Sequence, residues 1–211
     1  MSNALSIAAV TAVLKHLLEN GMVQDSITQS VGDVIVTAIP PDMITVGTDE
    51  RTQLNLFLYQ ISQNRNVDWI PENFRDRYSQ SRENQYDKHP PLALDLHYLL
   101  TAYGSKDFQT ELLLGYAMQL LHQTPIVTSD AIESILNYLL KANTSSIFSQ
   151  ALANLSVSDL TNSLGQIKLS PQFLNMEDTS KLWSALQTHY RPSASYQASM
   201  VLIDTKTSVV S

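Results

Sequence analysis

Residues 92–104 read LALDLHYLLTAYG, and the alternation of their side chains predicts a β-strand. The apolar side chains that share one face of this strand are those of Leu92, Leu94, Leu96, Tyr98 and Leu100. The opposite face opens with Ala93, Asp95 and His97. An acid and an imidazole on one face could be half of a catalytic site, a plain polar surface, or part of a surface that another protein covers.

Residues 52–62, TQLNLFLYQIS, predict a second strand. Simple alternation places Leu54, Leu56 and Leu58 on one face. It places Asn55, Phe57, Tyr59 and Ile61 on the other. Because both faces are largely apolar, we expect this strand to be central and covered on both sides. Pairing with residues 92–103 would form a hairpin with a long insertion, residues 64–91.

The remaining periodic segments complete an α+β pattern. Helices are predicted over residues 3–20 (capped by Ser2 or Asn3 and followed by Gly21), 107–122 (N-cap Asp107), 129–143 (cap Ser129 or Asp130) and 176–187 (cap Asn175). Further strands are predicted over residues 31–40, 165–171 (at an edge) and 195–204, with Tyr196, Ala198, Met200 and Leu202 on one face. We expect a single domain with a mixed, mainly antiparallel sheet flanked by helices.

The composition of the 211 residues excludes several classes of function. The absence of cysteine excludes disulfides, thiolate zinc sites and cysteine nucleophiles. A net charge of −7 argues against a nucleic-acid partner, which would call for a basic face. The charged fraction is 16%, against about 25% in an average domain, which favours a surface partly covered in an assembly.

The sequence also argues against direct insertion into a membrane. The apolar run near the N-terminus is too short and too interrupted to span a bilayer. It also lacks the preceding basic residues of a secretion signal. We therefore expect the protein to be cytoplasmic on synthesis.

Motifs for catalysis, cofactors and metals are not found in the sequence. His16, His89, His97, His122 and His189 do not fall at metal-ligand spacing, and neither GxSxG nor a phosphate-binding glycine motif occurs. We therefore predict no catalytic, cofactor-binding or metal-binding residue, and no enzyme. For Asp95 and His97 we favour a polar pair at a sheet–helix contact or an oligomer interface over a small hydrolase.

The insertion over residues 64–91 combines aromatic and basic side chains, a composition typical of interface hot spots. The candidates for interface residues are Trp69, Phe74, Arg75, Arg77, Tyr78 and Tyr86, together with Asp95 and His97. Two interpretations remain open for the insertion. It could fold back over a small satellite core, or it could be an arm that docks a neighbouring subunit.

Three ordered blocks together resemble a known family. They are PPLALDLHYLLTAYG (90–104), ELLLGYAMQLLHQTPIV (111–127) and KLWSALQTHYRPSASYQASMVLID (181–204), and NLFLYQISQNRN (55–66) is similar in style. The sequence resembles the tail-terminator, or cap, domain of extracellular contractile injection systems, which are phage-tail-like particles. On this resemblance, residues 1–204 form the cap domain and residues 205–211 a C-terminal tail.

The resemblance implies structural work without cofactors. Members of such a family form a homohexameric ring that ends the inner tube and anchors the last ring of sheath, in a particle that is released or membrane-anchored. The implied partners are further copies of the chain, the inner tube protein and the sheath protein. Sheet edges and extended termini are natural joints in a ring, and TKTSVVS (205–211) is a candidate added strand. The alternative is an adaptor that docks the particle to a membrane or a regulator.

Overall fold

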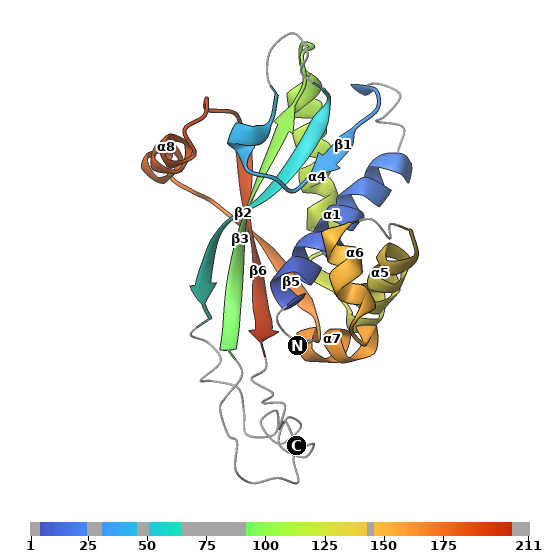
Figure 1. Ribbon diagram of the computed structural model, residues 1–211. Helices are drawn as coiled ribbons and strands as arrows, with labels where there is room; N and C mark the ends of the chain where they lie inside the picture. Colours follow the sequence, from blue (N-terminus) through green and yellow to red (C-terminus); the bar gives the residue numbers. More distant parts are fainter. Residues whose placement is uncertain (1–4, 25–30, 46–50, 65–91, 143–145, 204–211) are drawn as a thin grey trace, which may run out of the picture.

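The computed structural model describes residues 5–24, 31–45, 51–64, 92–142 and 146–203. Within these ranges, helices pack around one six-stranded sheet with the strand order β1-β2-β3-β6-β5-β4 (Figure 1). β1 is parallel to β2, and the other neighbouring strands are antiparallel. The predicted α+β class with a mixed, mainly antiparallel sheet is confirmed.

The elements follow most of the predicted segments. The strands are β1 (Ile35–Thr37), β2 (Gln53–Gln63), β3 (Leu92–Tyr103), β4 (Ile126–Val127), β5 (Ile167–Gln172) and β6 (Ser193–Ile203). The helices are α1 (Ser6–Gln24), the short 3-10 helix η2 (Pro41–Met43), α4 (Gln109–Gln123), α5 (Ser129–Ala142), α6 (Ile147–Ala153), α7 (Val157–Leu164) and α8 (Met176–Ala185). The predicted hairpin is present as the antiparallel pair β2–β3, whereas β4 and α7 were not predicted.

One face of the sheet packs against α1, α4, α5 and α7 and forms the main core (Figure 1). Leu96, Tyr98 and Leu100 of β3 point into this core, as their alternation predicts. The Tyr98 hydroxyl lies 2.8 Å from Oγ1 of Thr11 on α1. Burial raises the pKa of Tyr98 well above its usual value, so this phenol stays neutral and ties the helix to the sheet.

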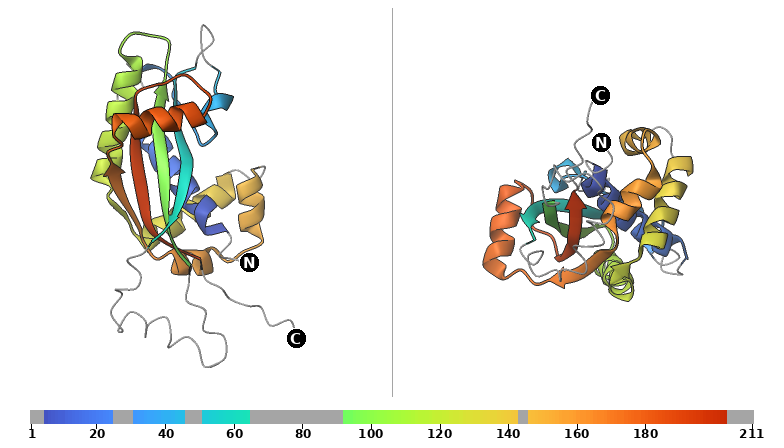
Figure 2. Two further views of the ribbon diagram at one scale, coloured as in Figure 1. Left: turned by 90° about the vertical axis from the view of Figure 1, so that its left-hand side faces the viewer. Right: turned by 90° about the horizontal axis from the view of Figure 1, so that it is seen from below.

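Among the described residues, the opposite face is covered only in part. In the left view of Figure 2, α8 crosses in front of the upper half of the sheet. Under this cover, Leu99 and Tyr103 of β3 and Trp183 of α8 are buried. The guanidinium of Arg191 stacks 4.8 Å from the centre of the Tyr103 ring. Asp95 and His97 lie on this same face, nearer the start of β3.

Two β-bulges change which side chains share a face. The β2–β3 register shifts between Leu58 and Gln60, so Ile61 pairs with the core residue Leu96. The β3–β6 register shifts at Ser199 and Met200, after which Val201 belongs to the main core. The faces predicted for Ile61 and Leu202 were therefore wrong, because alternation continues only while neither strand has an extra residue.

Helix α1 does not end at Gly21, as predicted, but continues to Gln24. Gly21 serves a close helix crossing instead: a Cβ atom there would lie 2.3 Å from Cδ2 of Leu120 on α4. The hydroxyl of Tyr116, also on α4, donates a hydrogen bond to the Gly21 carbonyl at 3.0 Å. The approach of the Leu120 side chain, and not the end of a helix, therefore favours glycine at this position.

The helix caps agree with prediction at one end and differ at two others. Asn175 caps α8, its Oδ1 accepting from the Asp178 amide at 2.8 Å, as predicted. The residue before α4 is Phe108, with a left-handed φ of 62° and no side-chain cap, so the prediction of Asp107 was wrong. At α5, Oγ1 of Thr128 accepts from the Ala131 amide, so the cap is Thr128 and neither of the predicted residues, Ser129 or Asp130.

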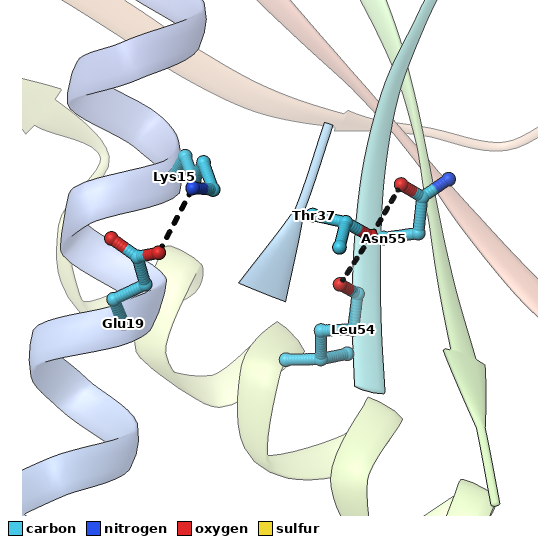
Figure 3. A network of polar contacts seen from close by, with 5 residues as sticks. All are labelled: Lys15, Glu19, Thr37, Leu54 and Asn55. Carbon is cyan, nitrogen blue, oxygen red and sulfur yellow. Dashed lines mark hydrogen bonds and ion pairs between the residues drawn. The ribbon is translucent and has the colours of Figure 1, made fainter. Parts of the chain in front are cut away.

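A buried asparagine completes the short pairing of β1 with β2. Asn55 is fully buried, and its Oδ1 accepts from the Thr37 hydroxyl at 2.9 Å and the Ile39 amide at 3.1 Å. Its Nδ2 donates to the Ile39 carbonyl at 2.9 Å. Figure 3 shows Thr37 between Asn55 and the Leu54 carbonyl. The Asn55 side chain thus bonds the main chain of Ile39 at the point where β1 leaves the sheet. β1 is much shorter than the predicted strand 31–40.

Replacing Asn55 should expose how much this bridge stabilises the domain. We expect Asn55→Ala to lower the free energy of unfolding by at least about 2 kcal/mol, because the Ile39 amide and carbonyl lose their partner in a buried site. Thr37→Val is the matched control, since it keeps the Ile39 bridge and should cost about 1 kcal/mol. Urea denaturation followed by circular dichroism measures both; equal losses would contradict the role of the bridge.

Candidate assembly surface

A chain of hydrogen-bonded side chains crosses the open part of the second sheet face. We call it the polar row; its members are Ser62 (β2), His97 (β3), Gln172 (β5), and Gln197 and Ser199 (β6). Nε2 of His97 lies 2.8 Å from the Ser62 hydroxyl, and Nδ1 lies 2.9 Å from Oε1 of Gln172. Gln172 reaches across β6, which separates its strand from β3.

The hydrogen bonds along the polar row are all donated in one direction, from Ser62 toward Ser199. Nε2 of Gln172 donates to Oε1 of Gln197, whose own Nε2 donates to the Ser199 hydroxyl at 3.2 Å. Oε1 of Gln172 therefore accepts from N–H at Nδ1 of His97. In the neutral imidazole, Nε2 is then an acceptor for the Ser62 hydroxyl. All five side chains are half-buried, so the row joins four strands at a surface that a partner can still reach.

Asp95 does not orient His97. Its Oδ1 accepts from Nδ2 of Asn64 at 2.9 Å, while both ring nitrogens of His97 are occupied by Ser62 and Gln172. The sequence brought Asp95 and His97 to one face, but the structure gives them separate partners. A hydrolase that uses Asp95 to orient His97 is therefore not supported.

Ser62, His97 and Gln172 do reproduce the order of a nucleophile, a base and an orienting amide. Such a set also needs main-chain or side-chain donors aimed at a developing oxyanion. Ser62 lies within β2 and pairs with Asp95 of β3. The nearby side-chain amide of Asn64 already donates to the Asp95 carboxylate. In the described residues, this arrangement is better suited to fixing a flat polar surface than to acyl transfer.

Sequence reasoning missed most of the polar row. Alternation along β2 places Ser62 on the core face with Leu54, but the bulge moves it beside His97. Gln172 lies 75 residues from His97 and carries no local signal for this contact. The other interface candidates, Trp69, Phe74, Arg75, Arg77, Tyr78 and Tyr86, lie outside the described residues.

Other kinds of site find little support in the part of the chain that is described. A search of these residues finds no group of His, Asp and Glu that could hold a metal ion. No described helix has the length and apolar character needed to cross a bilayer.

The fold is that of a tube terminator. A solved structure, the sheath/tube terminator of a PVC extracellular contractile injection system in its extended state, matches with a TM-score of 0.50 at 13% identity. The match covers 94% of this chain and 57% of that chain, so this chain spans a little over half of the terminator's length. At this identity the likeness shows the fold alone.

The family follows from the sequence itself. Residues 9–210 match the Pvc16 N-terminal domain, so the chain belongs to this family. The resemblance seen in the three sequence blocks is thereby confirmed. No curated protein matches the sequence.

A double-mutant cycle can test which residue His97 depends on. We expect His97→Ala and Gln172→Ala to be coupled by at least about 0.5 kcal/mol in the free energy of unfolding, because each removes the other's partner. His97→Ala and Asp95→Ala should instead add to within about 0.5 kcal/mol. Urea denaturation of the single and double variants measures both; strong coupling to Asp95 with none to Gln172 would contradict the polar row.

Proposed function

We propose that this protein is a structural cap that terminates the inner tube of a contractile injection particle and anchors its last ring of sheath. The observation that carries the proposal is the match of residues 9–210 to the Pvc16 N-terminal domain, supported by the fold it shares with a PVC sheath/tube terminator. The protein acts through its surfaces and not by breaking bonds. It is made in the cytoplasm and becomes part of the particle.

The cap works as a homohexameric ring formed by residues 1–204, with residues 205–211 as a tail. A closed ring fits the low charged fraction of 16%, since the centres of interfaces exclude charge. Its partners are further copies of itself, the tube protein and the sheath protein. Nucleic acid is not a partner, and no cofactor is needed.

The polar row and the long insertion are the surfaces we assign to these contacts. Asp95 and His97 lie on the part of the sheet face beyond α8, where half-buried amides and hydroxyls can exchange hydrogen bonds with a neighbour. The insertion supplies aromatic and arginine side chains: Trp69, Phe74, Arg75, Arg77, Tyr78 and Tyr86. In the chain it connects the end of β2 with the start of β3, and these two strand ends lie at the same end of the sheet as that part of the face (Figure 1).

Loss of the protein should remove the control of particle length. In a bacterium that carries the gene, we expect deletion to leave tubes or sheaths of uneven length, because no ring stops their growth. Electron microscopy of purified particles measures the length distribution and the shape of the ends. Expression of the intact chain should restore both, and uniform blunt-ended particles in the deletion strain would contradict the proposal.

The same strain separates the cap from the alternative adaptor. A cap carrying an affinity tag should co-purify with tube and sheath proteins and label one end of each particle. An adaptor would instead co-purify with membrane or regulatory proteins, and particles would keep their normal length without it. A six-fold average of the labelled end would establish the ring.

Removal of the insertion should separate folding from docking. We expect deletion of residues 68–88 to leave the free energy of unfolding nearly unchanged but to weaken the attachment of the protein to particles. Alanine at Trp69, Phe74, Tyr78 and Tyr86 should weaken attachment while keeping the length of the insertion. Urea denaturation and co-sedimentation with particles measure the two effects; normal co-sedimentation of both variants would contradict a docking role.

A further inference from the structure

The two edges of the sheet differ in how they are protected. On the β5 side, β4 pairs with Ile167 and Lys168, the Leu169 amide donates to the Pro125 carbonyl, and Pro171 carries no N–H. On the β2 side, pairing with β1 ends at Asn55 in the part of the chain described. The rest of β2, LFLYQISQ (56–63), contains neither a charge nor a proline. Natural edge strands carry such protection because an open edge is a template for another strand.

The register identifies which main-chain groups face outward from this edge. The Asn64 amide donates to the Ala93 carbonyl, so Asn64 points its main chain toward β3. Antiparallel pairs alternate, so Ile61 and Gln63 direct their N–H and C=O groups away from β3. Beyond the bulge, Leu58 does the same, as a partner of Tyr98. We call Leu58–Gln63 the free edge.

A largely apolar groove meets the free edge at its first residue, Leu58. It has a volume of about 400 Å³ and is lined by residues of α1, α6 and β2, among them Ala8, Ala12, Leu58 and Phe148. Side chains of an added strand alternate between its two faces, and those opposite Leu58 would lie beside this groove, because its lining on β2 is Leu56, Phe57 and Leu58. Ile61 is 45% exposed at the same edge and would gain cover from such a strand.

We propose that the free edge receives residues 205–211 of a second copy of this chain as an added β-strand. This inference rests on the proposed ring. The segment TKTSVVS is rich in β-branched residues and has a single charge, which suits pairing with an uncharged edge. The family match extends to residue 210, so it includes most of this segment.

Length and position also favour this occupant. Seven residues in an extended strand span roughly 23 Å, and the six residues of the free edge span roughly 20 Å. The segment follows β6, whose end lies at the same end of the sheet as the end of β2 (Figure 1). The donor segment and the acceptor edge are different surfaces, so the contact is head-to-tail. Repetition of such a contact forms a ring when the rotation between neighbouring subunits divides a full turn evenly.

Disulfide trapping tests the pairing directly, because the chain has no cysteine of its own. One tagged copy carries Gln63→Cys at the free edge, and an untagged copy carries Lys206→Cys, Thr207→Cys or Val210→Cys, which sample both faces of an added strand. After the two copies are mixed at high concentration and oxidised, we expect a disulfide-linked dimer of tagged and untagged chains for at least one tail position. As the control, each variant is oxidised with wild-type chain, and no such mixed dimer should form. The position that reacts reports whether the added strand is parallel or antiparallel.

Two outcomes of this experiment overturn the inference. Absence of a mixed dimer at all three tail positions would show that the segment does not reach a neighbour's free edge. A double variant, with both cysteines in one chain, that closes within a single chain would show that the segment pairs with its own edge. If particle ends are still capped in either case, the proposed function stands and its ring uses another joint.

Substitutions in the full chain give an independent measurement. Ile61→Pro removes an outward N–H without removing a bond to β3, and Ile61→Ala is the control that keeps this N–H. We expect self-association, measured by analytical ultracentrifugation, to weaken at least tenfold in Ile61→Pro and in a chain lacking residues 205–211, but not in Ile61→Ala. Gln63→Pro, nearer the end of β2, repeats the test where Ile61→Pro impairs folding. Unchanged association in the proline and truncated variants would overturn the inference.

Discussion

Every main-chain N–H and C=O group in a sheet needs a partner, and this requirement organises the whole domain. In the centre, β2, β3 and β6 satisfy it by long antiparallel ladders. At one edge the requirement is met by β4, Pro125 and the absence of an N–H in Pro171. At the other, β1 serves only three residues, and Asn55 replaces a strand with its own amide group. Beyond β1 and Asn55, the outward N–H and C=O groups of β2 are the groups to which a strand of a neighbour can bind.

The same sheet separates stability from contact. Its first face is closed by helices, and the pairing of Tyr98 with Thr11 shows how completely that face is withdrawn from water. Its second face is closed by α8 only toward Tyr103. Beyond that cover, the polar row holds its side chains in fixed positions by bonds between strands. A surface ordered in this way loses little conformational freedom when another subunit covers it, which suits a protein of this family.

Prediction from the sequence succeeded where a local pattern decides the outcome and failed where distant strands decide it. The alternation of residues 92–103 predicted β3 and its core face, and the side chain of Asn175 predicted the start of α8. The bulge in β2 was beyond prediction, because an extra residue is accommodated only in relation to the strand beside it. The short α7 and β4 were missed because so few residues carry no reliable period.

The amino-acid sequence by itself determined the α+β class, the β2–β3 hairpin and, through its ordered blocks, the family. It did so because periodicity and composition are local properties of the chain. Only the tertiary structure decided that Ser62 and Gln172, rather than Asp95, hold His97, and that β2 has an open edge within the described residues. Those outcomes depend on the register between strands far apart in the chain, and a shift of one residue exchanges the two faces of a strand.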